Sequence, residues 1–158
     1  VKVGGEGFDT RIVDGLLEVK AKSAMKGYLN APSPFTSDGW FKTGDAVEKK
    51  GDYIKILGRK SEIINVGGEK VYPQEIENII LQDSNVAEAT VFGEKNPIMG
   101  NIVCAALRLI NDENKKIVTK RIKSFCKSQL DNYKVPVKIT ISKSNHYSER
   151  FKKSRIQK

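Results

Sequence analysis

Several positions in the middle of the chain carry groups that could contact a ligand. Asp45 follows Gly44, which has no side chain, and the Asp45 carboxylate can accept hydroxyl donors from a bound molecule. Arg59 follows Gly58 and presents a planar guanidinium with a fixed fork of N–H donors. Gly67-Gly68 can adopt positive φ and so bring the backbone close to a ligand. Each feature also has a plain interpretation as a turn, because short motifs often occur without function.

The elements that position these groups are predicted to be a strand, a turn and a helix in close succession. Tyr53–Leu57 is a strand-like run, and the β-branched segment Ile63–Val66 predicts a second short strand. Gly67-Gly68 follows as a turn, and Pro73 then opens a helix in its first turn, where a missing N–H costs little. This stretch divides a turn-rich first part of the chain from a second part that contains helices.

The first part, residues 1 to about 57, has the pattern of short strands joined by turns. Leu16–Lys22 ends in the alternation of a half-buried strand, and the breaker-rich residues 27–34 predict a loop. Asp38-Gly39 is a tight-turn signal, and Trp40 with the residue after it supplies apolar anchorage. Because the segment has too few apolar residues for a core of its own, we interpret it as the end of a larger β-rich subdomain.

The second part predicts a small α+β unit of about 95 residues, a size at which a domain folds alone only marginally. Apolar residues recur at helical spacing in two places, which predicts amphipathic helices. They are Ile76, Ile79 and Ile80 in a helix over about 74–83, and Val118, Ile122, Phe125 and Cys126 in a helix over about 115–130. Residues 86–92, 101–109 and 137–141 are predicted strands, the first two forming a hairpin with a long loop over 93–100.

Composition excludes several classes of protein. A length of 158 residues corresponds to about one domain, and Val1 in place of an initiator Met leads us to expect a piece of a longer chain. Neither a long apolar run nor a secretory signal is visible, so we expect a cytoplasmic protein without a membrane span. Cys104 and Cys126 lie among apolar residues and are expected to be buried, reduced thiols. With a single His in the chain, no metal site is expected.

The net charge of +9 is unevenly distributed. Residues 114–158 hold 14 Lys or Arg against two acidic residues, a net of +12, which leaves about −3 for the remainder. Such a skew indicates an anionic partner, which could be a nucleic acid, a phosphate-bearing small molecule or an acidic protein. A solvated lysine-rich surface is the alternative interpretation.

Five motifs in the same order resemble those of the adenylate-forming enzymes, which include acyl- and aryl-CoA synthetases, luciferases and peptide-synthetase adenylation domains. The resemblance covers nearly the whole chain, and the five together are far more specific than any one. The motifs are Gly27-Tyr28-Leu29-Asn30, Asp38-Gly39-Trp40-Phe41-Lys42-Thr43-Gly44-Asp45, Gly58-Arg59, Gly67-Gly68-Glu69-Lys70-Val71-Tyr72-Pro73-Gln74-Glu75-Ile76-Glu77 and Leu130-Asp131-Asn132-Tyr133-Lys134-Val135-Pro136.

The resemblance implies an AMP-forming acid–thiol ligase, with ATP, Mg²⁺ and CoA as cofactors and substrates. A carboxylate attacks the α-phosphate of ATP to give an acyl-adenylate, and a thiol then displaces AMP. Residues 1–60 would be the C-terminal end of the large N-terminal domain, and residues 61–158 a mobile lid with a short sheet flanked by helices. ATP phosphates and Mg²⁺ would be held mainly by the N-terminal domain missing here, so the isolated fragment is expected to be inactive.

Roles for individual residues follow from their places in the resembling motifs. Asp45 would bind the ribose hydroxyls of ATP or AMP, and Arg59 would bind the ribose hydroxyls or the phosphate. Lys60 and Ser61 would form the hinge, where the family more often has Asp or Lys than Ser, and a small residue there can absorb changes in φ and ψ. The loop Gly67, Gly68 and Glu69 would line the passage for the pantetheine arm of CoA.

The basic tail departs from the family pattern. The family ends in Pro-Arg-Thr-x-(Ser/Thr)-Gly-Lys-x-x-Arg, whose lysine steadies negative charge while the adenylate forms. Alignment on Lys-x-x-Arg pairs Lys152 with Arg155 and replaces the glycine by Phe151, so Lys152 is the predicted catalytic residue and Lys153 the fallback. An unstructured basic tail without a catalytic lysine is the alternative.

Two other functions compete with a CoA ligase. The thiol acceptor could be the pantetheine of a carrier protein, which would make the basic lid a docking surface. A basic nucleic-acid-binding module is a minor alternative, supported only by the charge of residues 114–158, since no aromatic-rich strand motif or zinc spacing accompanies it. The carboxylic acid substrate and the oligomeric state are not encoded in any motif of this stretch.

Overall fold

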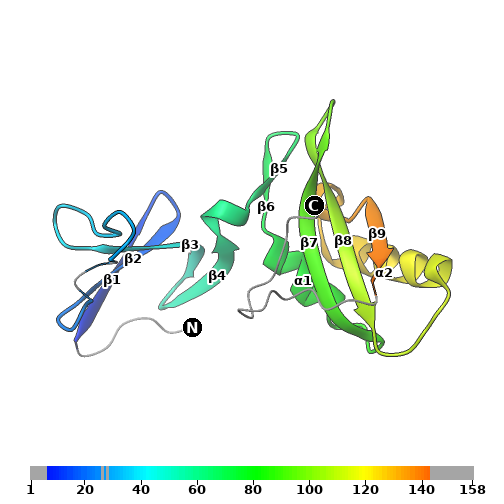
Figure 1. The fold of residues 1–158 in the computed structure, drawn as a ribbon, viewed down its shortest axis with the longest axis horizontal. Helices are drawn as coiled ribbons and strands as arrows, with labels where there is room; N and C mark the ends of the chain where they lie inside the picture. The colour runs from blue at the N-terminus through cyan, green and yellow to red at the C-terminus, as the bar shows by residue number, and fades with distance from the viewer. Residues whose placement is uncertain (1–6, 26, 28, 143–158) are drawn as a thin grey trace. The chain divides into compact units, whose positions relative to one another are not determined.

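The computed structural model describes residues 7–25, 27 and 29–142, and the chain divides into two compact units after Ser61. The first unit is a four-stranded antiparallel sheet in which each strand pairs with the next along the chain (Figure 1). Its strands are β1 (Phe8–Val13), β2 (Leu16–Ala21), β3 (Phe41–Lys50) and β4 (Tyr53–Arg59).

A small apolar cluster holds this sheet together. Leu17, Val47 and Ile54 are its buried members, one from each of β2, β3 and β4. Short strands were predicted for this part, and they are present. The ten-residue strand β3 was not expected, because its residues include Gly44 and two consecutive lysines; it forms because both of its edges are paired.

The second unit contains a hairpin, two helices and a three-stranded sheet (Figure 1). Its elements are β5 (Ile64–Val66), β6 (Glu69–Val71), α1 (Pro73–Ile80), β7 (Val86–Asn96), β8 (Gly100–Leu109), α2 (Lys115–Gln129), a 3₁₀ turn (Asn132–Lys134) and β9 (Lys138–Ile141). In the sheet, β7 pairs antiparallel with β8, which pairs parallel with β9 on its other edge. This confirms the predicted α+β class.

The core of the second unit lies between one face of that sheet and the two helices. Ala89 and Val91 of β7 stand opposite Leu107 and Ala105 of β8, and all four are buried in one cluster. Helices α1 and α2 supply the other side of the cluster, with buried residues at helical spacing as predicted. These are Ile76 and Ile80 of α1 and Val118, Ile122 and Cys126 of α2.

A buried carboxylate joins α1 to the sheet. Pro73 begins the helix, as predicted, and Glu77 lies one turn further on with only 3% of its surface exposed. Its Oε1 accepts a 2.8 Å hydrogen bond from the backbone N–H of Val91, so a carboxylate rather than a strand provides that amide's acceptor.

Three details of the second unit differ from the sequence-based expectations. Helix α1 ends at Ile80 rather than near residue 83. The β7–β8 hairpin has a short connection, Pro97–Met99, because the strands pair as far as Asn96 and Gly100; the long loop over 93–100 was wrong. Phe125 is partly exposed, and the fully buried residues of α2 are Val118, Ile122 and Cys126.

Candidate functional site

The two residues predicted to bind nucleotide lie opposite each other in the first unit. Asp45 of β3 and Arg59 of β4 are direct partners in the antiparallel ladder. The Arg59 Nε lies 2.9 Å from Asp45 Oδ1, and the Arg59 side chain is 60% exposed against 25% for Asp45. Asp45 thus lies within a strand, not in a turn, and the carboxylate and guanidinium form one partly open polar site.

Thr43 organises the backbone around this pair, a role that its place in the motif did not reveal. Its hydroxyl donates to the carbonyl of Leu17 at 2.9 Å and accepts from the N–H of Asp45 at 3.0 Å. Its carbonyl accepts from Arg59 Nη1 at 3.1 Å. Gly44, between them, has a φ of +76°, a conformation that favours glycine. The Thr-Gly-Asp sequence therefore sets the position of both charged groups.

The Asp45–Arg59 ion pair is weak enough to be exchanged for a ligand. An exposed pair of this kind contributes about 0–1 kcal/mol, because water already solvates both charges well. A vicinal diol could take the acceptor positions of the carboxylate while the guanidinium turns to a hydroxyl or phosphate oxygen. The residues present therefore fit the ribose of a nucleotide.

The earlier half of the same motif is structural. Arg11 of β1 donates to Asp38 at 2.8 Å and to Glu18 at 2.7 Å, and it lies 4.5 Å from the centre of the Trp40 ring. The hydrogen bond from Arg11 lowers the pKa of Asp38 from 3.8 to about 2. Lys20 adds a 2.9 Å bond to the Asp38 carbonyl. These contacts fix the predicted Asp38-Gly39 turn, at which Gly39 has positive φ.

The glycine pair predicted to line a thiol passage is the turn between β5 and β6. Gly67 and Gly68 have φ values of +58° and +93°, and the strands pair on both sides, with Val66 opposite Glu69. Gly67, Gly68 and Glu69 are all exposed. A side chain at Gly68 would meet no atom within 4 Å, so the backbone there is open to an approaching molecule.

The predicted hinge residues are the last two residues of the first compact unit. Lys60 and Ser61 begin a single 3₁₀ turn, Lys60–Glu62, and the division between the units follows Ser61. Both side chains are exposed. The predicted catalytic Lys152 and its fallback Lys153 lie outside the described residues.

Other features of the described residues offer no competing active site. Cys104 and Cys126 are buried free thiols, as predicted, and burial raises the pKa of each to about 11, so neither is a nucleophile at neutral pH. In residues 7–25, 27 and 29–142, no cluster of His, Cys, Asp or Glu could hold a metal ion. None of the helices in that same part of the chain is long and apolar enough to cross a membrane.

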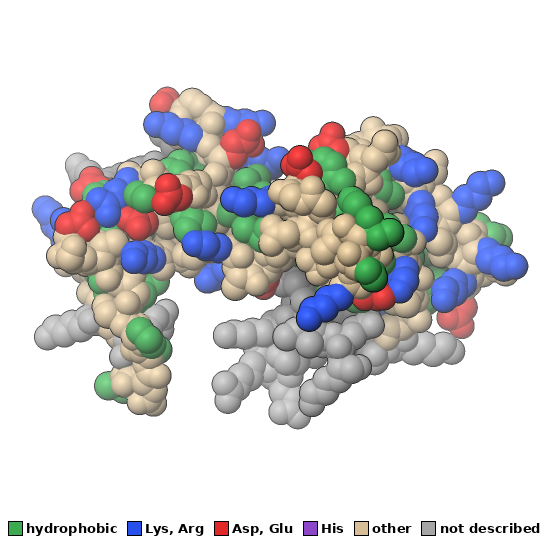
Figure 2. All heavy atoms as spheres, turned by 90° about the horizontal axis from the view of Figure 1, so that it is seen from above, with side chains coloured by type: hydrophobic (Ala, Val, Ile, Leu, Met, Phe, Trp, Pro, Cys, Tyr) green, Lys and Arg blue, Asp and Glu red, His purple; other side chains and the backbone are tan. Residues whose placement is uncertain are grey.

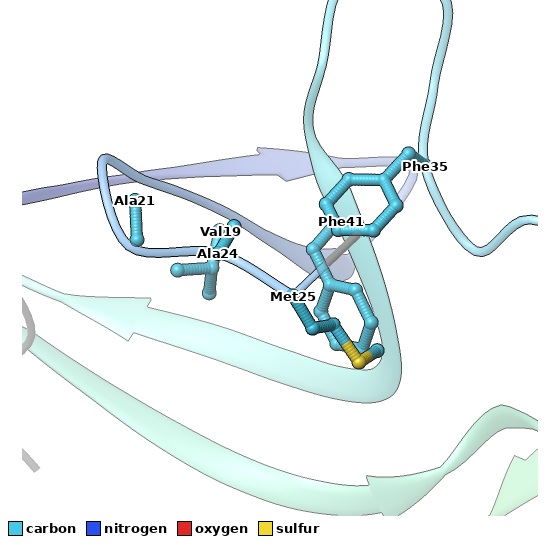
Figure 3. Close-up of a pocket in the computed structure, with 6 residues that line it drawn as sticks. All are labelled: Val19, Ala21, Ala24, Met25, Phe35 and Phe41. Carbon is cyan, nitrogen blue, oxygen red and sulfur yellow. The ribbon is translucent and has the colours of Figure 1, made fainter. Parts of the chain in front are cut away.

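An apolar cavity of about 290 Å³ lies in the first unit (Figure 3). The side chains that line it are Val19, Ala21, Ala24, Met25, Phe35 and Phe41. The Phe35 and Phe41 rings stand edge to face, 5.5 Å apart. This lining is apolar and offers no charged side chain to a phosphate or a carboxylate.

The chain is similar in sequence to known proteins of one family. Residues 75–146 match the model of the AMP-binding enzyme C-terminal domain. The chain is 36% identical over 129 residues to a medium-chain acyl-CoA ligase of Mus musculus, covering 78% of the chain and 21% of that ligase. It is 36% identical over 148 residues to a 2-succinylbenzoate–CoA ligase of Bacillus licheniformis, covering 91% of the chain and 29% of that enzyme.

Solved structures agree. An o-succinylbenzoate CoA synthetase of Bacillus subtilis, in complex with its acyl-adenylate intermediate, superposes with a TM-score of 0.85 at 29% identity. That match covers 95% of this chain and 33% of the synthetase. The chain thus spans less than a third of the length of the curated relatives described above. By motif, fold and relatives, it belongs to the adenylate-forming acyl- and aryl-CoA synthetases and corresponds to the C-terminal portion of its members.

Proposed function

We propose that the chain is part of an ATP-dependent carboxylate–CoA ligase. In the first step a carboxylate and ATP give an acyl-adenylate and pyrophosphate. In the second step the thiol of CoA attacks the acyl carbon, a thioester forms and AMP leaves. The names of the relatives, which are CoA ligases, support CoA rather than a carrier protein as the acceptor.

One observation carries this proposal: the pairing of Asp45 with Arg59 next to the division between the two units. Arg59 is the last residue of β4, so it belongs to the first unit, and the 3₁₀ turn that follows leads into the second. A nucleotide ribose bound by Asp45 and Arg59 would stay with the first unit while the second changed position. That arrangement suits a reaction in which one bound nucleotide must meet two sets of groups in turn.

The remaining roles follow from this division. Residues 1–60 would be the end of the large domain, and residues 61–158 the lid that pivots at Lys60 and Ser61. For adenylation the lid would present Lys152, or Lys153 in its place, to the carboxylate and α-phosphate. For thioester formation it would present Gly67, Gly68 and Glu69 to the pantetheine arm. Mg²⁺ and the ATP phosphates would be held mainly by the upstream part of the enzyme.

In the folded structure, the basic C-terminal third gives weaker support for a nucleic-acid partner than it does in the sequence alone. The fold brings carboxylates from earlier in the chain to several of its cations: Arg121 bonds to Asp83 and Glu113, and Lys134 lies 3.2 Å from Glu75. On the face shown in Figure 2, the Lys and Arg side chains of the described residues are interspersed with other groups and form no continuous basic surface among them.

The test uses a protein that carries this chain together with the upstream domain. With a panel of aliphatic and aromatic carboxylic acids and ATP, we expect acid-dependent pyrophosphate release, and thioester formation once CoA is added. The 158-residue chain alone should release no pyrophosphate. Turnover by the chain alone would show that its active site had been misplaced, and nucleic-acid binding in place of acid activation would overturn the proposal. Thioester formation on a carrier protein but not on CoA would show that the acceptor is the carrier protein.

A further inference from the structure

The Gly67-Gly68 turn does not stand alone but is held by the tip of the β7–β8 hairpin, beside which β5 and β6 lie (Figure 1). The N–H of Gly67 donates to the carbonyl of Met99 at 2.8 Å. The side-chain amide of Asn101 donates to the carbonyl of Asn65 at 2.9 Å. Two hydrogen bonds across a long stretch of sequence therefore fix both the turn and the strand that leads into it.

The hairpin tip is itself preformed. The Asn96 side chain accepts from the N–H groups of Ile98 and Met99, each at 3.0 Å, which closes the connection between β7 and β8. Gly100 has a φ of +72°, which turns the chain back into β8 beside Asn65. The Met99 carbonyl and the Asn101 amide are thereby presented on the same short segment.

The turn is constrained on one side and open on the other. A β-carbon at Gly67 would lie 2.8 Å from the end of the Met99 side chain, whereas one at Gly68 would meet nothing within 4 Å. The Met99 methyl group can shift, so the hydrogen bonds rather than this contact define the position of the turn. Gly68 is the edge that a ligand can reach.

From this geometry we propose that Asn101 is a positioning residue for thioester formation. Its side-chain amide, acting through the Asn65 carbonyl, holds the glycine turn against the hairpin tip so that the open edge at Gly68 has a single orientation. This inference rests on the proposed function, because it takes the turn as a wall of the passage for the pantetheine arm. Asn101 itself is not expected to touch the reacting atoms.

The first test measures the turn directly, in the chain described here. Asn101→Asp keeps the shape of the side chain but removes its N–H donor and places a carboxylate beside the Asn65 carbonyl. We expect backbone amide exchange at Gly67 to become about fivefold faster, the effect of one ordinary hydrogen bond. Asn101→Gln, which retains an amide donor, should recover part of the protection. Lys95→Ala is the matched control, since Lys95 is exposed and is the ladder partner of Asn101.

The second test uses the protein that includes the upstream domain and measures the two steps separately. Asn101→Asp should lower thioester formation from supplied acyl-adenylate about fivefold, change adenylate formation by less than about twofold, and be partly rescued in Asn101→Gln. Lys95→Ala should leave both steps unchanged. Equal losses in both steps, or unchanged exchange at Gly67, would overturn the positioning role. If the unmodified protein performs neither step, the proposed function fails, while amide exchange still decides whether Asn101 holds the turn.

Discussion

The two units of the chain are stabilised in different ways. The second has sixteen buried residues in one apolar cluster, drawn from two helices, two sheets and the segment before β9. The first has three, and polar contacts around Arg11, Trp40 and Asp45 hold much of the rest. Apolar burial contributes about 25 cal/mol per Å², whereas exposed ion pairs contribute little. The second unit therefore has a much larger apolar core than the first.

The largest expected effect tests the core of the second unit. Ile122→Ala should lower its free energy of unfolding by about 2–5 kcal/mol, because Ile122 is fully buried among α1, α2 and the sheet. Far-UV circular dichroism in urea reports mainly this unit, since α1 and α2, the α-helices of the described residues, both belong to it. Ile54→Ala, in the first unit, is the control and should leave that transition in place. Coincident shifts in both variants would show that the units unfold as one.

The next largest expected effect separates the two steps proposed for the second unit, adenylate formation and thioester formation. In the full-length enzyme, Lys152→Ala should slow adenylate formation by roughly 10²–10³, the loss of about 2.7–4 kcal/mol when one fixed group opposite developing charge is removed. Thioester formation from supplied acyl-adenylate should be largely retained, and Lys153→Ala should do little. Reversed effects would assign the role to Lys153, and equal small effects would mean that the tail has no catalytic lysine.

A third substitution acts on the connection between the units. Ser61→Pro fixes φ and removes an N–H within the 3₁₀ turn Lys60–Glu62. If the units must change their relative position during turnover, one step should fall by at least about tenfold more than the other, since a locked hinge favours a single arrangement. Lys55→Ala, on the exposed side of β4, serves as the control. Equal modest losses in both steps would place the pivot elsewhere.

The smallest effect is the pH dependence of the first unit. Arg11 lowers the pKa of Asp38 from 3.8 to about 2, so the ionised form stabilises the folded state. This contribution is complete above about pH 4 and is lost as the pH falls toward 2. Fluorescence of Trp40, the only tryptophan in the chain, reports the first unit alone. The unfolding midpoint of the first unit should fall as the pH is lowered over that range, and Asp38→Asn should flatten this pH dependence. An unchanged slope in the variant would mean that another carboxylate causes the pH dependence.

The sequence predicted more of the second unit than of the first, because apolar spacing marks a residue that faces a core, whereas strand pairing leaves no local pattern. Helical spacing located α1 and α2 because their apolar residues face a core. Strand β3 was missed because Gly44 and Asp45 resemble turn residues, and only pairing on both edges makes them a strand. The pairing of Asp45 with Arg59 depends on a register shift beside Ala46, which no local pattern encodes. The contact of Asn101 with Asn65 carried no sequence signal, because it joins a side-chain amide to a backbone carbonyl far away in the chain.

The parallel pairing of β9 with β8 also bears on the order of folding and on truncation. Strands β7 and β8 are joined by three residues, whereas β9 reaches β8 only after α2 has been crossed, so its pairing costs more loop-closure entropy and should come late. Until then the outer edge of β8 is unpaired, because the carbonyls of Val103 and Leu107 accept hydrogen bonds there from the N–H groups of Val137 and Ser142. An uncovered apolar edge strand recruits other chains. A nascent or proteolysed chain that ends before Lys138 should therefore aggregate through β8.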